Sequence, residues 1–102
     1  MGFRNEQGVT RIEAVGRIKC FCPLGDDWYS GDVAVKVESP EMIPDYCDVD
    51  KMLAAIDGSD RIIEDVCSDV HSWFKDATHG RVSVSVSVSD SVHLPVVVTK
   101  ED

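Results

Sequence analysis

The sequence has no long apolar run and no targeting pattern, which argues against a membrane-spanning helix and a secreted precursor. A run of about 18 apolar residues is needed to cross a bilayer, whereas the mean hydropathy of this chain is −0.10. Residues 1–10 are polar and contain glycine, unlike the apolar centre of a signal peptide. We therefore predict a cytoplasmic protein that makes no membrane contact, with a flexible segment at residues 1–9.

Positive charge is scarce: 10 Lys and Arg residues stand against 19 Asp and Glu residues, for a net charge of −9. Proteins that bind nucleic acid through its phosphates usually present a basic surface. The negative net charge argues against a basic surface that binds nucleic acid, although it does not exclude a nucleic-acid substrate. A chain of 102 residues predicts one domain, residues 1–102. So short a chain can need a neighbouring subunit to complete a site.

Cysteine and histidine are too few and too scattered to predict a metal centre. The four cysteines stand at positions 20, 22, 47 and 67, and a reducing cytoplasm favours free thiols over disulfides. Cys20 and Cys22 form a Cys-x-Cys that could start a zinc site. However, the three histidines show no paired ligand spacing and there is no second Cys pair, so we predict no metal.

One stretch, residues 18–32, combines a nucleophile with nearby acids and aromatic residues. Cys22 ends an alternating segment and is followed by Pro23, which cannot donate to a sheet and pushes Cys22 toward an extended conformation. Asp27 and Asp32 follow within ten residues, close enough along the chain to supply a proton. The alternative is that Cys22 is an inert, buried thiol like most free cysteines.

Four segments show the period-two alternation of strands that are covered on one face. Residues 11–22 and 33–38 predict a hairpin whose loop, over the turn at residues 25–31, is roughly eight residues long. Residues 81–92 are the clearest strand, because valines at 82, 84, 86 and 88 alternate with serines. Residues 96–98 follow Pro95 and predict the fourth strand.

Two segments show helical spacing of apolar residues between the second and third strands. The first is predicted to begin after an N-cap at Asp48 and to end at Gly58. The second is predicted to begin near Ser59 or Asp60 and to end at residues 79–80. Cys67 lies on its apolar face, so we expect that thiol to be inert.

These elements predict an α+β fold of order ββααββ, an antiparallel four-stranded sheet with two helices on one face. A sheet this small leaves unpaired edges, and edges of this kind need protection. Assembly of several chains into a closed, oligomeric β-barrel would supply it.

This order, with a Cys-Pro at the end of the first strand, resembles the tunnelling fold and, within it, the 7-cyano-7-deazaguanine reductases, the QueF family. The resemblance extends over residues 10–98 and rests on few specific motifs. It implies that Cys22, in Ile-Lys-Cys-Phe-Cys-Pro-Leu, is the thiol that adds to a nitrile carbon. It also implies that Glu64, in Arg-Ile-Ile-Glu-Asp-Val, binds the heterocycle. A carboxylate there can accept two N–H donors from a guanine-like edge.

Three departures from the reductase pattern narrow this resemblance. The reductases carry Cys-Pro-x-Thr-Gly-Gln-Pro-Asp, whereas the eighth position here is Tyr29, so the proton-donating aspartate is displaced to Asp27 or Asp32 or is absent. Ile63 replaces the histidine that precedes the family's glutamate. The nicotinamide-binding signature, similar to Glu-Ser-Lys-Ser-Leu-Lys, is replaced at residues 46–51 by Tyr-Cys-Asp-Val-Asp-Lys. These changes resemble the short QueF-like amidinotransferases of archaeosine formation, which use ammonia in place of hydride, and imply no cofactor.

The implied reaction converts the nitrile of a 7-cyano-7-deazaguanine unit, free or in tRNA or DNA, into an amidine. Cys22 attacks the nitrile, a nearby acid protonates the nitrogen, and ammonia displaces the resulting thioimide. The resemblance also implies a homo-oligomer of pentameric rings or stacked rings. Two alternatives stay open: an NADPH-dependent reductase of the same fold, and a non-catalytic or pterin-handling member of it.

Overall fold

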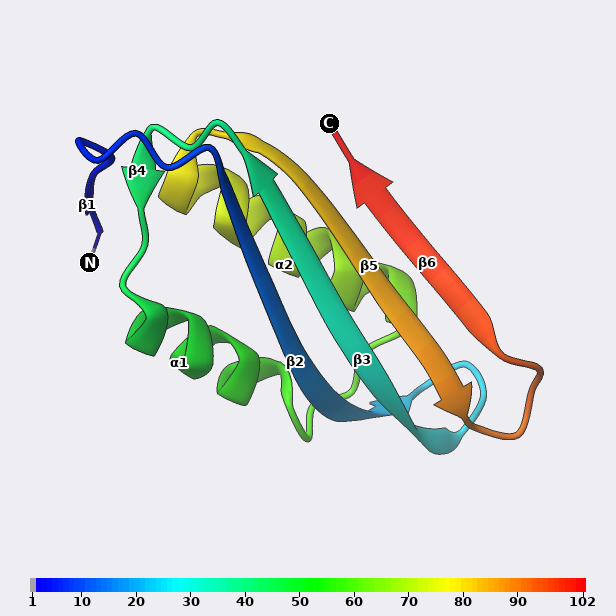
Figure 1. The fold of residues 1–102 in the computed structure, drawn as a ribbon. Coiled ribbons are helices and arrows are strands. Elements are labelled where there is room, and N and C mark those ends of the chain that lie inside the picture. Colours follow the sequence, from blue (N-terminus) through cyan, green and yellow to red (C-terminus); the bar gives the residue numbers. More distant parts are fainter. Residues whose placement is uncertain (1) are drawn as a thin grey trace.

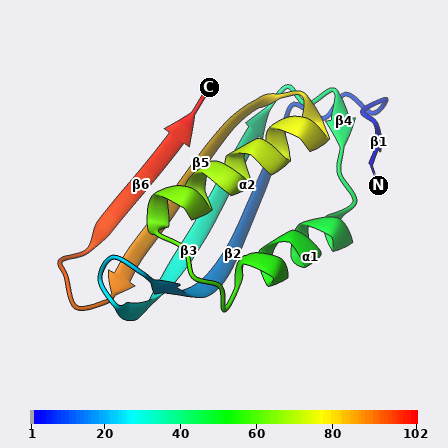
Figure 2. The ribbon, with the colours of Figure 1, turned by 180° about the vertical axis from the view of Figure 1, so that it is seen from behind.

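The computed structural model describes residues 2–102 as two layers, a four-stranded antiparallel sheet and a pair of helices on one of its faces (Figure 1). The strand order is β2-β3-β5-β6. Seen from behind, α2 crosses the middle of the sheet and α1 lies beside β2 (Figure 2). The predicted order ββααββ and the placement of both helices on one face are confirmed.

The hairpin of β2 (Arg11–Cys22) and β3 (Asp27–Glu38) forms the longest ladder of the sheet. Its register runs without interruption from Arg11 opposite Glu38 to Cys22 opposite Asp27. The connecting loop therefore comprises residues 23–26, and the predicted loop of about eight residues is wrong. Asp26 adopts a positive φ of 54° at the end of this loop. Aspartate tolerates that conformation better than most residues, so the chain can turn tightly.

The helix ends differ from the predicted ones, although both helices exist. Helix α1 (Tyr46–Ile56) is capped by Asp45, whose side chain accepts a hydrogen bond from the Cys47 backbone N–H at 2.9 Å, so Asp48 is not the N-cap. Helix α2 (Ile63–Thr78) begins later than predicted, because residues 58–61 pair with the end of β2 instead. It ends as predicted at His79, in the left-handed conformation with φ 54°.

The core lies between the sheet and α2. Strand β5 (Arg81–Asp90) turns its valines inward, and Val82, Val84, Val86 and Val88 are each at most 1% exposed. They pack in one cluster with Val66, Val70 and Phe74 of α2. The predicted inner face is confirmed, and the serines at 83, 85 and 87 on the other face are half-buried.

The remaining strands lie at the margins of the fold. Strand β6 (Val96–Glu101) pairs with β5 and extends beyond the predicted residues 96–98. Strands β1 (Phe3–Arg4) and β4 (Met42–Ile43) form a separate antiparallel pair, which the sequence did not predict. Residues 1–9, expected to be flexible, therefore include one short paired strand.

Strands β2 and β6 are the two edges of the four-stranded sheet. Within residues 2–102 each pairs with a single neighbouring strand, so the outer edge of β6 and most of that of β2 are open there. Closure of these edges into an oligomeric barrel stays a prediction. Between residues 2 and 102, neither helix combines the length and the apolar character that crossing a membrane requires.

Candidate active site

Cys22 is a half-buried thiol at the last position of β2. It shares the helix-covered face of the sheet with Cys20. The loop folds back over the sulfur, since the Gly25 backbone N–H donates to Cys22 Sγ at 3.4 Å. The Asp26 N–H donates to the Cys22 carbonyl at 2.8 Å. The thiol is therefore held by a turn of fixed geometry yet remains partly accessible.

The segment between the helices binds the same end of β2. The Phe21 N–H donates to the Ser59 carbonyl, and the Arg61 N–H donates to the Phe21 carbonyl, both at 3.0 Å. Two residues earlier on β2, the Lys19 carbonyl accepts a hydrogen bond from the Gly58 N–H at 2.7 Å. Because α2 starts at Ile63, these bonds fix the first turn of α2 beside the end of the strand that carries Cys22.

Glu64 lies in that first turn of α2 and is exposed. A carboxylate at a helix N-terminus is favoured by the helix dipole. Nearby, the Arg61 guanidinium pairs with Asp69 one turn further along α2, and its Nε donates to Ser59 Oγ at 3.0 Å. Glu64 is thus an accessible acceptor on the element that the Cys22 strand anchors.

Tyr29 connects these groups from β3. It is directly opposite Cys20 in the ladder, is 3% exposed, and donates from its hydroxyl to the Arg61 carbonyl at 2.8 Å. Burial raises the pKa of Tyr29, and the nearby Cys20, Cys22 and Glu64 raise it further. Cys22 and Glu64 therefore both lie within electrostatic reach of one buried hydroxyl.

The two candidate aspartates occupy different places. Asp27 is directly opposite Cys22, and its Oδ1 accepts a hydrogen bond from the Trp28 backbone N–H at 2.8 Å. Asp32 is exposed, pairs with Arg17 at 3.6 Å, and lies five residues further along β3 on the other face of the sheet. At about 3.4 Å per residue this separation is roughly 17 Å along the strand. Within one chain the structure thus brings Asp27 to Cys22 and leaves Asp32 away from it.

The other cysteines have different surroundings. Cys20 is fully buried, and its thiol donates to the Ile56 carbonyl at 3.3 Å. Cys67 is buried on α2 and donates to the Val84 carbonyl at 3.4 Å. Burial raises the pKa of the Cys67 thiol, which disfavours the reactive thiolate. Cys47 is exposed but lies at the start of α1, at the opposite end of the molecule from the end of β2 (Figure 1).

No protein-family model matches the sequence, and no curated protein matches it. Among solved structures, the crystal structure of the archaeosine synthase QueF-Like in the apo form superposes with a TM-score of 0.82. The match covers 92% of this chain and 94% of that one, at 20% sequence identity. The chain has the fold of archaeosine synthase QueF-Like. The tunnelling fold expected from the sequence is therefore confirmed.

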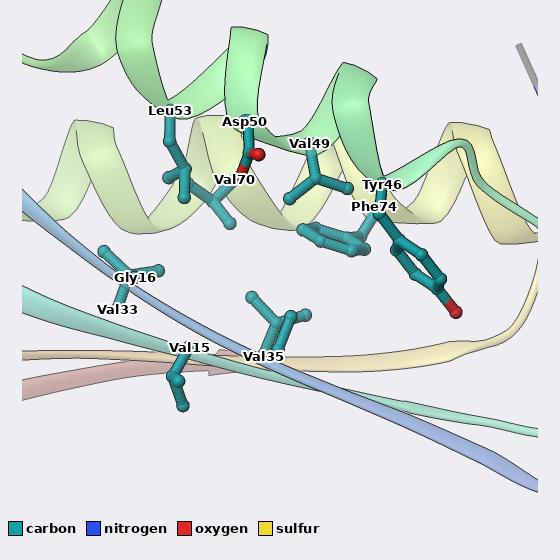
Figure 3. Close-up of a pocket in the computed structure, with 11 residues that line it drawn as sticks. Val15, Gly16, Val33, Val35, Tyr46, Val49, Asp50, Leu53, Val70 and Phe74 are labelled. Carbon is teal, nitrogen blue, oxygen red and sulfur yellow. The ribbon is translucent and has the colours of Figure 1, made fainter.

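A separate apolar cavity of about 190 Å³ lies between α1 and the sheet (Figure 3). Val49 and Leu53 of α1 face Val33 and Val35 of β3 across it, with Tyr46 at one end. Gly16 of β2 allows the close approach, because a Cβ there would lie 2.6 Å from Leu53 Cδ1. Neither Cys22 nor Glu64 lines this cavity, so it is distinct from the candidate site.

Among residues 2–102, no three His, Cys, Asp or Glu side chains gather as metal ligands. Tyr29 is a buried side chain next to the candidate site that sequence reasoning missed. Its parity with the buried Val33 and Val35 on β3 indicates the inner face, and that signal could have identified it.

Proposed function

We propose that this chain is an amidinotransferase that converts the nitrile of a 7-cyano-7-deazaguanine unit to an amidine with ammonia. One observation carries the proposal: a half-exposed cysteine at a strand end is held beside a helix N-terminus that presents a glutamate. The fold shared with archaeosine synthase QueF-Like supports it. Partly exposed thiols near a helix start are the usual setting of reactive cysteines.

Glu64 is proposed to recognise the base. Its exposed carboxylate at the start of α2 can accept two N–H donors from the guanine-like edge of the substrate. Hydrogen bonds to an ionised acceptor are roughly twice as strong as those between neutral groups. Such a pair would also orient the heterocycle, so that its nitrile reaches Cys22.

The proposed chemistry proceeds in two covalent steps. The Cys22 thiolate adds to the nitrile carbon, a nearby acid protonates the nitrogen, and ammonia then displaces the sulfur to give the amidine. Covalent catalysis of this kind divides one difficult addition into two easier ones. Asp27, opposite Cys22 in the ladder, is the candidate carboxylate for the acid within one chain. Asp32 lies on the other face of the sheet and could not reach Cys22 of the same chain from there.

Ammonia is proposed in place of a hydride donor because residues 46–51 lack the basic signature of the reductases. In this chain the segment contains Asp48 and Asp50 and a single basic residue, Lys51. A phosphate-bearing nicotinamide would meet negative charge there. The proposed partners are therefore the deazaguanine base, free or in tRNA or DNA, and ammonia, in a cytoplasmic protein that needs no cofactor.

The chain is proposed to act as a homo-oligomer of pentameric rings or stacked rings. The exposed edges of β2 and β6 support this, because each leaves backbone groups unpaired in a single chain. Pairing the two edges between neighbours would close a barrel. Sedimentation of the purified protein should show a ring, and a stable active monomer would exclude it.

Intact mass spectrometry after incubation with 7-cyano-7-deazaguanine tests the function directly. We expect a covalent adduct on Cys22 and its release by ammonium as an amidine, identified by chromatography. An aminomethyl product formed with NADPH would instead indicate the reductase. No adduct with the free base or with a tRNA or DNA oligonucleotide carrying it would favour the pterin-handling or non-catalytic alternative.

A further inference from the structure

Tyr29 holds a buried hydroxyl on the same face of the sheet as Cys22. It is opposite Cys20, and Cys22 lies two residues along the partner strand, so Tyr29 and Cys22 are diagonal neighbours. Diagonal pairs on an antiparallel ladder stand about 7–8 Å apart, which a tyrosine side chain can span. The hydroxyl donates a hydrogen bond to the Arg61 carbonyl, two residues before the start of α2. A substrate held between Cys22 and Glu64 would therefore lie next to it.

We propose that the Tyr29 hydroxyl is the acid that protonates the nitrile nitrogen and then the base that accepts a proton from ammonia. This inference rests on the proposed function and assigns its proton transfers. The position that is aspartate in the reductases is thus occupied by a different acid, rather than left empty.

The proton balance closes with Tyr29 alone. The Cys22 thiolate forms the S–C bond while one C–N π bond breaks, and its electron pair on nitrogen takes the phenolic proton. This leaves a neutral thioimide and the Tyr29 phenolate. Ammonia then forms a C–N bond and gives one proton to the phenolate, while the S–C bond breaks and its electron pair returns to Cys22. The step uses no oxidant or reductant, and both residues regain their starting states.

The raised pKa of Tyr29 and the hydrogen bond made by Asp27 favour Tyr29 over Asp27 as the acid. An acid must carry a proton when the thiolate attacks, and burial raises the pKa of Tyr29 above its ordinary value near 10. The titratable groups that face the hydroxyl, Cys20 and Cys22 of β2 and Glu64 of α2, act in the same direction. Asp27 instead uses Oδ1 to accept from the Trp28 N–H, the contact of an acceptor.

Adduct formation with free 7-cyano-7-deazaguanine, followed by intact mass, tests the assignment. Tyr29→Phe should slow the adduct about 100-fold or more, the usual loss for a general acid. Its affinity for the base, measured by calorimetry, should match that of the unchanged chain. The matched control is Tyr46→Phe, the same chemical change at the distant cavity, which should react at the normal rate. Asp27→Asn should lose less than Tyr29→Phe.

A second variant keeps the hydroxyl and changes only its acidity. The chain has two tyrosines, so difluorotyrosine incorporated throughout a Tyr46→Phe chain labels Tyr29 alone. Fluorination lowers the phenol pKa. Adduct formation should therefore fall at alkaline pH in the fluorinated protein and not in its unfluorinated counterpart.

The outcomes separate the two proposals. No adduct in the unchanged chain would overturn the proposed function and this inference with it. Three results would overturn the inference alone. They are a normal adduct rate in Tyr29→Phe, a greater loss of rate in Asp27→Asn than in Tyr29→Phe, and an adduct rate at alkaline pH that is the same with and without fluorination.

Discussion

His71, midway along α2, meets Asp102, with Nε2 of His71 2.9 Å from Oδ1 of Asp102. The same carboxylate also contacts Lys75, whose Nζ donates to Oδ2 at 2.8 Å, and the Val82 backbone N–H, which donates to Oδ2 at 2.9 Å. One side chain thereby connects the end of β6 to both α2 and β5.

This contact predicts a pH dependence of stability. Hydrogen bonding to Lys75, with the Val82 N–H and His71 contributing, lowers the pKa of Asp102 from 3.8 to about 2. A lowered folded-state pKa stabilises the protein above the unfolded value, and the gain is lost as pH falls from about 4 to about 2. Asp102→Asn should therefore lower the melting temperature at neutral pH, and the difference should vanish near pH 2. Glu101→Gln, at the exposed neighbouring carboxylate, is the control and should leave the acid limb unchanged.

The parts of the fold that the sequence predicted are those with strong local periodicity. Alternation at residues 82–88 identified the inner face of β5, and the stripe of α2 identified its buried side. The errors arose where distant contacts decide. Asp45 and Asp48 are equally good caps by type, and only the fold selects Asp45. The start of α2 depends on residues 58–61 pairing with β2, a contact that no local pattern contains.

The same distinction applies to the site. The position of Cys22 at the end of a strand was predictable, because Pro23 marks the strand end locally. Its proximity to the first turn of α2 depends on hydrogen bonds between segments almost forty residues apart, and only the resemblance suggested Glu64. The prediction for Asp32 rests on its short distance from Cys22 along the chain. An uninterrupted ladder with side chains alternating between faces places it on the opposite face from Cys22.

The inner face of β5 should not tolerate charge. Val84 and Val86 are fully buried among apolar side chains, so Val84→Asp or Val86→Asp would bury an unpaired carboxylate. A buried charge without a partner destabilises by about 3 kcal/mol or more, a large fraction of the roughly 5–15 kcal/mol that keeps a small domain folded. Ser89→Asp, on the same strand but exposed, is the control. Circular dichroism of a folded, soluble Val84→Asp protein would contradict the assignment of faces.

Base recognition should depend on Glu64 without affecting the fold. Glu64→Gln keeps the shape of the side chain, but it leaves one N–H donor of the heterocycle without a charged acceptor. We expect binding of 7-cyano-7-deazaguanine to weaken by about 2 kcal/mol, measured by calorimetry. Asp65→Asn, also exposed in the first turn of α2, is the matched control. Equal affinity in Glu64→Gln and the unchanged chain would remove Glu64 from the site.

The choice of nucleophile is the sharpest prediction, because the four cysteines differ so clearly in their surroundings. Cys22→Ala should abolish the adduct seen by intact mass, since Cys22 alone combines partial exposure with a position at the end of β2. Cys47→Ala and Cys67→Ala should react normally. Cys20 is the competitor, because it lies on the same face only two residues away. It is fully buried and already donates to the Ile56 carbonyl, so a heterocycle cannot reach it without opening the core. Peptide mapping that placed the adduct on Cys20 would move the site two residues deeper into the sheet and reverse the assignment.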